Sequence, residues 1–203
     1  MIPTMARTVQ RILAKVFSVV LLLVGLGALF GGNFAHNYVS DQLKQEKITM
    51  PADAQLTTQE MKDALGKYAG KEMTTGPQAE AFANDYLWEH MMSASGGKTY
   101  EEVSGAYTKL TDEQKASAEG QKLGGLRQTM FMGDALRSML LTAYAFWLVG
   151  TIAMWAGIAC ILLGLLLGLL GWFLWKNNHG VDDDLSTARP AHDTTTRSGS
   201  TVA

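Results

Sequence analysis

The side chains that could do chemistry in this sequence are few, and the histidines come first. The chain has one cysteine and four histidines, which are Cys160, His36, His90, His179 and His192. None of the histidines stands at metal-ligand spacing from another histidine, from the cysteine or from a suitable carboxylate. These residues therefore predict no zinc or iron site.

A second pattern places His90 among methionines. His90 is followed by two methionines, and two more lie further along the chain: Met91, Met92, Met130 and Met132. Thioether and imidazole ligands together suit copper(I). Methionine also fills irregular helical cores, and the sequence favours that role here. His90 is then expected to be a hydrogen-bonded histidine of the core.

Two further patterns resemble catalytic motifs only in part. Asp85 and Glu89 lie one helical turn apart, as paired acids would, but a solvated helix face has the same pattern. Gly96-Gly97-Lys98-Thr99 resembles the end of a phosphate-binding loop, yet the first glycine of that motif and a preceding strand are missing. The sequence therefore predicts no catalytic residue, no cofactor, no metal site and no enzyme activity.

The elements that would have to position such residues are dominated by two apolar segments. Residues 16–35 and residues 138–175 contain no charged side chain, and the second run is 38 residues long. About 20 apolar residues are enough to cross a bilayer as a helix. The first run lacks the small-residue pattern that a signal peptidase needs, and no lipobox cysteine follows it. Both runs therefore predict retained transmembrane helices, with membrane lipids around them.

Charge sets the expected orientation. Residues 1–15 carry three basic side chains and no acidic one, so this segment is expected in the cytoplasm. Two crossings return residues 176–203 to the same side, where their composition predicts a disordered cytoplasmic tail. Residues 36–137, with 11 basic and 15 acidic side chains, become an extracytoplasmic domain. The expected location is the plasma (inner) membrane, and the net charge of −2 argues against nucleic-acid binding.

Helix-start signals punctuate residues 36–137. Three capping boxes begin at Thr57, Thr99 and Thr111, and Gly76-Pro77 places proline at a first helical position. We expect the first apolar helix to continue until Pro51 and a last helix to begin near Leu126, after Gly124-Gly125. No useful strand alternation occurs. The prediction is an all-α membrane protein in which two transmembrane helices form an antiparallel hairpin that carries an extracytoplasmic helical domain.

The second apolar run is too long for one bilayer crossing. A helix of 38 residues is ~57 Å long, against ~30 Å of hydrocarbon. Trp147, Trp172 and Trp175 match the two interfaces and place the span at about residues 148–173. The apolar residues before it must be covered by the outer domain or by another protein. The candidate partner contacts are Leu140, Leu141, Tyr144, Phe146 and Trp147.

Small residues recur every seven positions in both spans. The predicted helix-packing interface consists of Ser18, Gly25 and Gly32 in the first span and Gly150, Gly157, Gly164 and Gly171 in the second. Seven residues make nearly two helical turns, so each set forms a stripe along which two backbones can approach. Glycine is also simply common in membrane helices, but the strict register favours packing. GxxxG pairs at Gly27–Gly31 and Gly164–Gly168 are a weaker sign.

Several short strings in order along the chain resemble a known protein family. They are Glu46-Lys47-Ile48-Thr49, Tyr68-Ala69-Gly70-Lys71, Thr75-Gly76-Pro77, Ala83, His90, Gly96-Gly97-Lys98-Thr99-Tyr100 and Leu136-Arg137-Ser138. This pattern resembles a group of actinobacterial two-span membrane proteins often labelled aromatic ring-opening dioxygenase. That label implies an iron held by two histidines and a carboxylate. The chain offers no such triad, so we do not adopt the label.

The resemblance implies a different role. One branch of the group is similar to the respiratory supercomplex-associated accessory factor that joins the cytochrome bcc complex to cytochrome c oxidase. The implied function is a non-catalytic accessory subunit, with those respiratory-chain membrane subunits as partners. The alternative is an envelope sensor or small-molecule-binding membrane module, which a deep, polar-lined pocket in the outer domain would favour.

Overall fold

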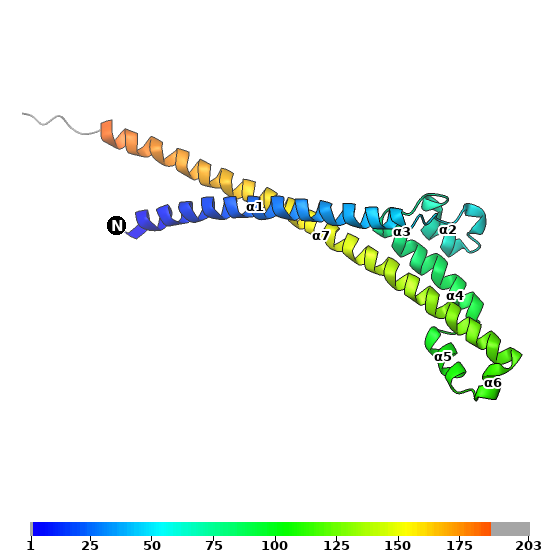
Figure 1. The fold of residues 1–203 in the computed structure, drawn as a ribbon. Coiled ribbons are helices and arrows are strands. Elements are labelled where there is room, and N and C mark those ends of the chain that lie inside the picture. The colour runs from blue at the N-terminus through cyan, green and yellow to red at the C-terminus, as the bar shows by residue number, and fades with distance from the viewer. Residues whose placement is uncertain (1, 188–203) are drawn as a thin grey trace, which may run out of the picture. The chain divides into compact units, whose positions relative to one another are not determined.

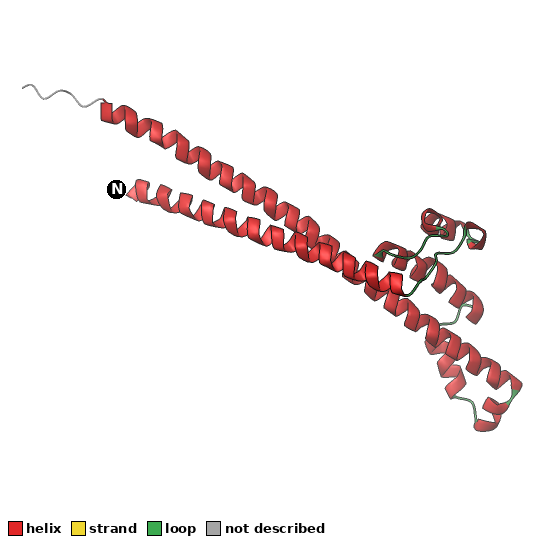
Figure 2. Cartoon of the chain, turned by 45° about the horizontal axis from the view of Figure 1, so that its top comes forward, coloured by secondary structure: helices red, strands yellow, loops and turns green. Residues whose placement is uncertain are grey.

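The computed structural model describes residues 2–187, with side chains at residues 9, 10 and 12–173. Figure 1 shows the order of the elements, and Figure 2 shows helices and loops without a strand in the described residues. The predicted all-α class is confirmed for this part of the chain. Residues 26–158 form one compact unit, and residues 2–25 together with residues 159–187 form a second.

The first long helix, α1 (Ile2–Gln45), is uninterrupted over 44 residues. The sequence predicts that Pro51 stops it, but it ends at Gln45. The reason is a local turn in which Lys47 adopts a left-handed φ of 51°. The chain then pairs with residues 71–73, because Met50 N–H donates to Lys71 O at 2.8 Å and Met73 N–H donates to Ile48 O at 2.8 Å. This short pairing closes the first loop of residues 36–137, which we call the outer domain after the position expected for it.

The middle of the outer domain consists of short helices. They are η1 (Asp53–Gln55), α2 (Gln59–Leu65), η2 (Gly66–Tyr68), α3 (Gly76–Ala81), the π-helix η3 (Phe82–Leu87) and α4 (Trp88–Ser95). The predicted cap at Thr57 is wrong by one residue, since Thr58 Oγ1 accepts from Met61 N–H. Proline at the start of α3 follows the predicted pattern, and α4 ends at Gly96, which adopts a left-handed conformation.

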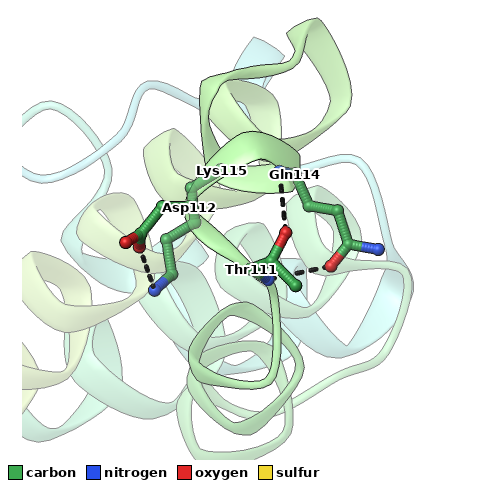
Figure 3. Close-up of polar contacts among 4 residues, drawn as sticks. All are labelled: Thr111, Asp112, Gln114 and Lys115. Carbon is green, nitrogen blue, oxygen red and sulfur yellow. Dashed lines mark hydrogen bonds and ion pairs between the residues drawn. The ribbon is translucent and has the colours of Figure 1, made fainter.

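Two capping boxes are confirmed further along. Thr99 caps α5 (Tyr100–Thr108), and Thr111 caps α6 (Asp112–Ala116). Figure 3 shows the second: Gln114 N–H donates to Thr111 Oγ1, Thr111 N–H donates back to Gln114 Oε1, and Lys115 pairs with Asp112 at 3.5 Å. The hydroxyl and amide thus satisfy backbone donors that the first turn leaves free.

The last helix, α7 (Ala118–Thr187), is 70 residues long. The expected break at Gly124-Gly125 is wrong, because Ser117 starts the helix earlier: its Oγ accepts from Gly120 N–H. Gly124 is needed for close packing, since a Cβ there would lie 3.0 Å from the Tyr107 ring.

The tail predicted to be disordered was expected to begin at residue 176. The structure instead continues the helix from Lys176 to Thr187, with no proline to stop it. The rest of that predicted tail, residues 188–203, lies outside the described residues.

The core of the larger unit joins the outer domain to α7 and α1. Its buried side chains are Val39, Leu43, Met50, Leu56, Met61, Leu65, Met73, Ala79, Ala81, Ala83 and Leu140. Arg137 on α7 makes polar contacts with the short helices. Its Nη2 donates to Asn84 Oδ1 at 2.9 Å, and its guanidinium lies 4.8 Å from the Trp88 ring centre. Residues 12–45 and 118–173 contain apolar stretches long enough to cross a membrane by length and composition.

Candidate functional site: a small-residue stripe and an outer groove

In the larger unit, the small-residue stripe lies where α1 packs on α7. Gly32 and Gly150 are both buried. A Cβ at Gly32 would lie 2.6 Å from Gly150 O, and a Cβ at Gly150 would lie 3.0 Å from Gly32 O. The obstacle in each case includes backbone, which cannot move aside as a flexible side chain can. Only glycine permits this approach.

In the smaller unit, the stripe has a hydrogen bond at its centre. Ser18 is 6% exposed, and its Oγ donates to Gly164 O at 2.7 Å. A Cβ at Gly164 would lie 3.1 Å from Ser18 O, and one at Gly168 would lie 3.0 Å from Ser18 Oγ. A Cβ at Gly171 would lie 3.9 Å from Lys15 Cγ. The small residues here therefore surround a buried interhelical hydrogen bond.

The remaining predicted members of the stripe, Gly25 and Gly157, are both buried. Of the two weaker GxxxG pairs, Gly164–Gly168 belongs to the close contacts around Ser18, whereas a Cβ at Gly27 or at Gly31 would meet nothing within 4 Å. The heptad set is thus the buried one, and the tetrad on α1 is not part of close helix packing in the described residues.

A cluster around His36 and Trp147 lies beside Gly150 at one end of the stripe, and it was not predicted from the sequence. The two rings stack at 4.0 Å and an interplanar angle of 6°. His36 Nε2 lies 3.0 Å from both Trp147 O and Thr151 Oγ1. Since the Thr151 hydroxyl itself donates to Trp147 O at 3.0 Å, Nε2 is the ring nitrogen that carries hydrogen. The sequence signal that could have placed His36 on the packing face of α1 is its spacing, because His36 follows Gly32 by one helical turn.

Trp147 also contacts the outer domain. A Cβ at Gly76 would lie 2.4 Å from Trp147 Cβ, so the start of α3 rests directly on this side chain. Tyr144 lies one turn before Trp147 on α7. The negative charge of the nearby Glu80 carboxylate raises the pKa of the Tyr144 hydroxyl, with desolvation and a hydrogen bond to Glu80 as smaller causes. Trp147 therefore connects three elements of this unit: α1, α3 and α7.

The predicted partner contacts divide into covered and open residues. Leu140 is 3% exposed and belongs to the chain's own core, so its prediction as a partner contact is wrong. Leu141 and Trp147 are partly buried against that core, and Tyr144 is half-buried. Phe146 is 62% exposed. The outer domain covers this apolar segment in part because α3 and the core helices pack on it.

The open side of the segment forms an apolar groove between α1 and α7. Its volume is about 500 Å³, and its main lining side chains are Phe34, Tyr38, Val39, Met139, Ala143 and Phe146. Met139 and Phe146 are 69% and 62% exposed. Exposed large apolar side chains gathered at one place are typical of an interaction surface.

The residues considered for catalysis are not brought together. Among the described residues, no group of three or more His, Cys, Asp or Glu side chains is placed to hold a metal. His90 is exposed, which corrects its expected place in the core, although its Nδ1 does bond Tyr86 O at 2.7 Å. Gly96-Gly97-Lys98-Thr99 forms the end of α4 and the cap of α5. No family model matches the sequence, and no curated protein or solved structure shows significant similarity to it.

Proposed function

We propose that the chain is an integral membrane protein in which α1 and α7 form an antiparallel transmembrane hairpin. Large apolar side chains on both helices face outward, among them Leu23, Phe30, Leu162 and Leu169. In water this surface would be strongly unfavourable, whereas lipid tails accommodate it. The small residues face inward, where backbones must approach because lipid supplies no hydrophobic drive for association. The basic residues of the N-terminal segment support a cytoplasmic position for both termini, with residues 36–137 extracytoplasmic.

We further propose that the protein is a non-catalytic accessory subunit of an actinobacterial respiratory supercomplex. The observation that carries an interaction role is the open groove beside Met139 and Phe146, outside the proposed span at 148–173. The resemblance of the sequence supplies the choice of partners, the cytochrome bcc complex and cytochrome c oxidase. In this account the hairpin anchors the protein, and the outer domain holds the groove at the membrane surface.

The experiment is a mild-detergent purification of the tagged full chain from its own membranes. We expect subunits of both respiratory complexes to co-purify. Phe146→Gln should reduce their yield severalfold, whereas Phe131→Gln, which changes an exposed phenylalanine outside the groove, should not. Purification without any oxidase or cytochrome subunit contradicts the proposal, as does an equal loss in both variants.

One feature favours the alternative, an envelope sensor or small-molecule-binding module. A hollow of about 360 Å³ lies between the α2–η2 segment and the α3–η3 segment, and its lining includes Lys67, Glu80 and Asp85. Its mixed charges suit a polar ligand. A ligand-dependent rise in Tm that is lost in both Lys67→Ala and Asp85→Ala, in a protein that purifies alone, supports the sensor instead.

A further inference from the structure

A separate cavity of the outer domain lies between α4 and α7. It has a volume of about 520 Å³, and three of its lining side chains carry potential metal ligands: His90, Met91 and Met132. The other lining residues are apolar apart from Thr129, whose hydroxyl donates to Gly125 O at 3.1 Å. No charged side chain is among the lining residues. The cavity therefore offers neutral nitrogen and sulfur donors in apolar surroundings.

His90 is held in one orientation. Its Nδ1 lies 2.7 Å from Tyr86 O, and its ring lies 4.2 Å from the Tyr86 ring. A carbonyl oxygen only accepts, so Nδ1 carries a hydrogen, and in the neutral ring Nε2 is the nitrogen that has the lone pair. Metal-binding histidines commonly donate their other N–H to a carbonyl in this way. Tyr86 lies in the π-helix η3, a rare form that is frequent at functional sites.

The two methionines come from facing helices. Met132 on α7 is 61% exposed, which a side chain that only fills a core would not be. Met91 on α4 is 4% exposed, and a Cβ at Gly133 would lie 2.6 Å from its Sδ. The Met91 sulfur therefore lies against Gly133, the residue next to Met132 on α7. Met130, by contrast, is fully buried and has a packing role.

We propose that His90 Nε2, Met91 Sδ and Met132 Sδ bind a monovalent copper ion. Thioethers and imidazole are the ligands that copper(I) accepts, whereas zinc, calcium and magnesium sites draw on thiolates, carboxylates or several oxygens. Three neutral donors leave the charge of the ion uncompensated. An apolar cavity without carboxylates tolerates one such charge more readily than two, so the site selects copper(I) over divalent ions.

The test is a competition titration of the purified full chain with copper(I) held by bathocuproine disulfonate under reducing conditions. The wild-type protein is expected to withdraw one copper ion per chain, and His90→Gln and Met132→Leu should each weaken binding by about tenfold or more. Met139→Leu is the matched control for copper affinity, because Met139 is a methionine of α7 that is 69% exposed, against 61% for Met132, and lies outside this cavity. Its affinity should equal that of the wild type.

Two outcomes overturn the proposal: no withdrawal of copper from the chelator, or affinities in His90→Gln and Met132→Leu that equal those of the Met139→Leu control. X-ray absorption of the copper-loaded protein must also show nitrogen and sulfur scatterers together. Helicity measured by circular dichroism separates a lost ligand from a lost fold. The titration does not depend on the respiratory partners, so either proposal can fail without the other.

Discussion

Gly76 is a residue at which the outer domain contacts helix α7 closely, because a Cβ there would lie 2.4 Å from Trp147 Cβ. Gly76→Ala should force α3 and Trp147 apart and lower the free energy of unfolding by about 1–3 kcal/mol. Thermal unfolding of the full chain in detergent measures the effect as a fall in Tm. Gly66→Ala is the control, since a Cβ at Gly66 would meet nothing within 4 Å. Equal Tm values for the two variants contradict this packing.

Glu102 is the residue for which a pH dependence follows. Hydrogen bonds from the Thr99 backbone N–H and hydroxyl lower the pKa of its carboxyl below the ordinary value of 4.5. A lowered folded-state pKa means that the cap stabilises α5 fully above about pH 4.5 and loses this effect as the pH falls through the folded-state pKa. A carbon-detected NMR titration should place the midpoint below 4.5 in the wild type and nearer 4.5 in Thr99→Ala. A wild-type midpoint at or above 4.5 rejects the account.

Single residues were predictable from the sequence where the interaction is local. The caps at Thr99 and Thr111 join residues three positions apart, so spacing alone identifies them. The stack of His36 on Trp147 joins residues 111 positions apart and left only a weak sign. The exposure of His90 likewise depends on how α7 packs on α4, and this packing cannot be predicted from a local sequence pattern.

At the scale of the helix, Gly32 and Gly31 are neighbours with opposite surroundings. A Cβ at Gly32 would lie 2.5 Å from Met154 Cγ and 2.6 Å from Gly150 O, whereas one at Gly31 would meet nothing within 4 Å. Gly32→Leu should therefore separate the helices at a cost of about 1–3 kcal/mol and lower Tm. Gly31→Leu should leave Tm nearly unchanged. A larger fall for Gly31→Leu means that the stripe has been assigned to the wrong face.

Helix periodicity was informative, and helix boundaries were less so. The glycines at seven-residue spacing are buried whereas a Cβ at Gly27 or Gly31 would meet no neighbour, because a seven-residue interval follows one face of a helix over many turns. The uninterrupted helix through Gly124 and Gly125 was missed. Glycine alone only weakens a helix, and here the Tyr107 ring needs the room that Gly124 leaves.

The whole molecule is proposed to cross the membrane twice, and its topology can be measured in intact cells. With Cys160 replaced by serine, single cysteines are placed at Met5, Glu80 and Thr195. A membrane-impermeant maleimide should label position 80 only, since the basic N-terminal segment is expected to stay inside. Labelling of position 195 from outside overturns the two-span arrangement.

The central claim is that the small-residue stripe holds α1 against α7, and disulfide crosslinking tests it most directly. Gly32→Cys is combined, in the Cys160→Ser background, with a second cysteine at Met154 or at Val149. A Cβ at Gly32 would lie 2.5 Å from Met154 Cγ, whereas the Val149 side chain is 62% exposed, so the stripe predicts strong crosslinking to position 154 and little to position 149. The crosslink to position 154 should be lost on adding Gly150→Leu but kept with Leu163→Ala. Crosslinks confined to position 149 contradict the account, because the glycines would then face lipid or a partner protein.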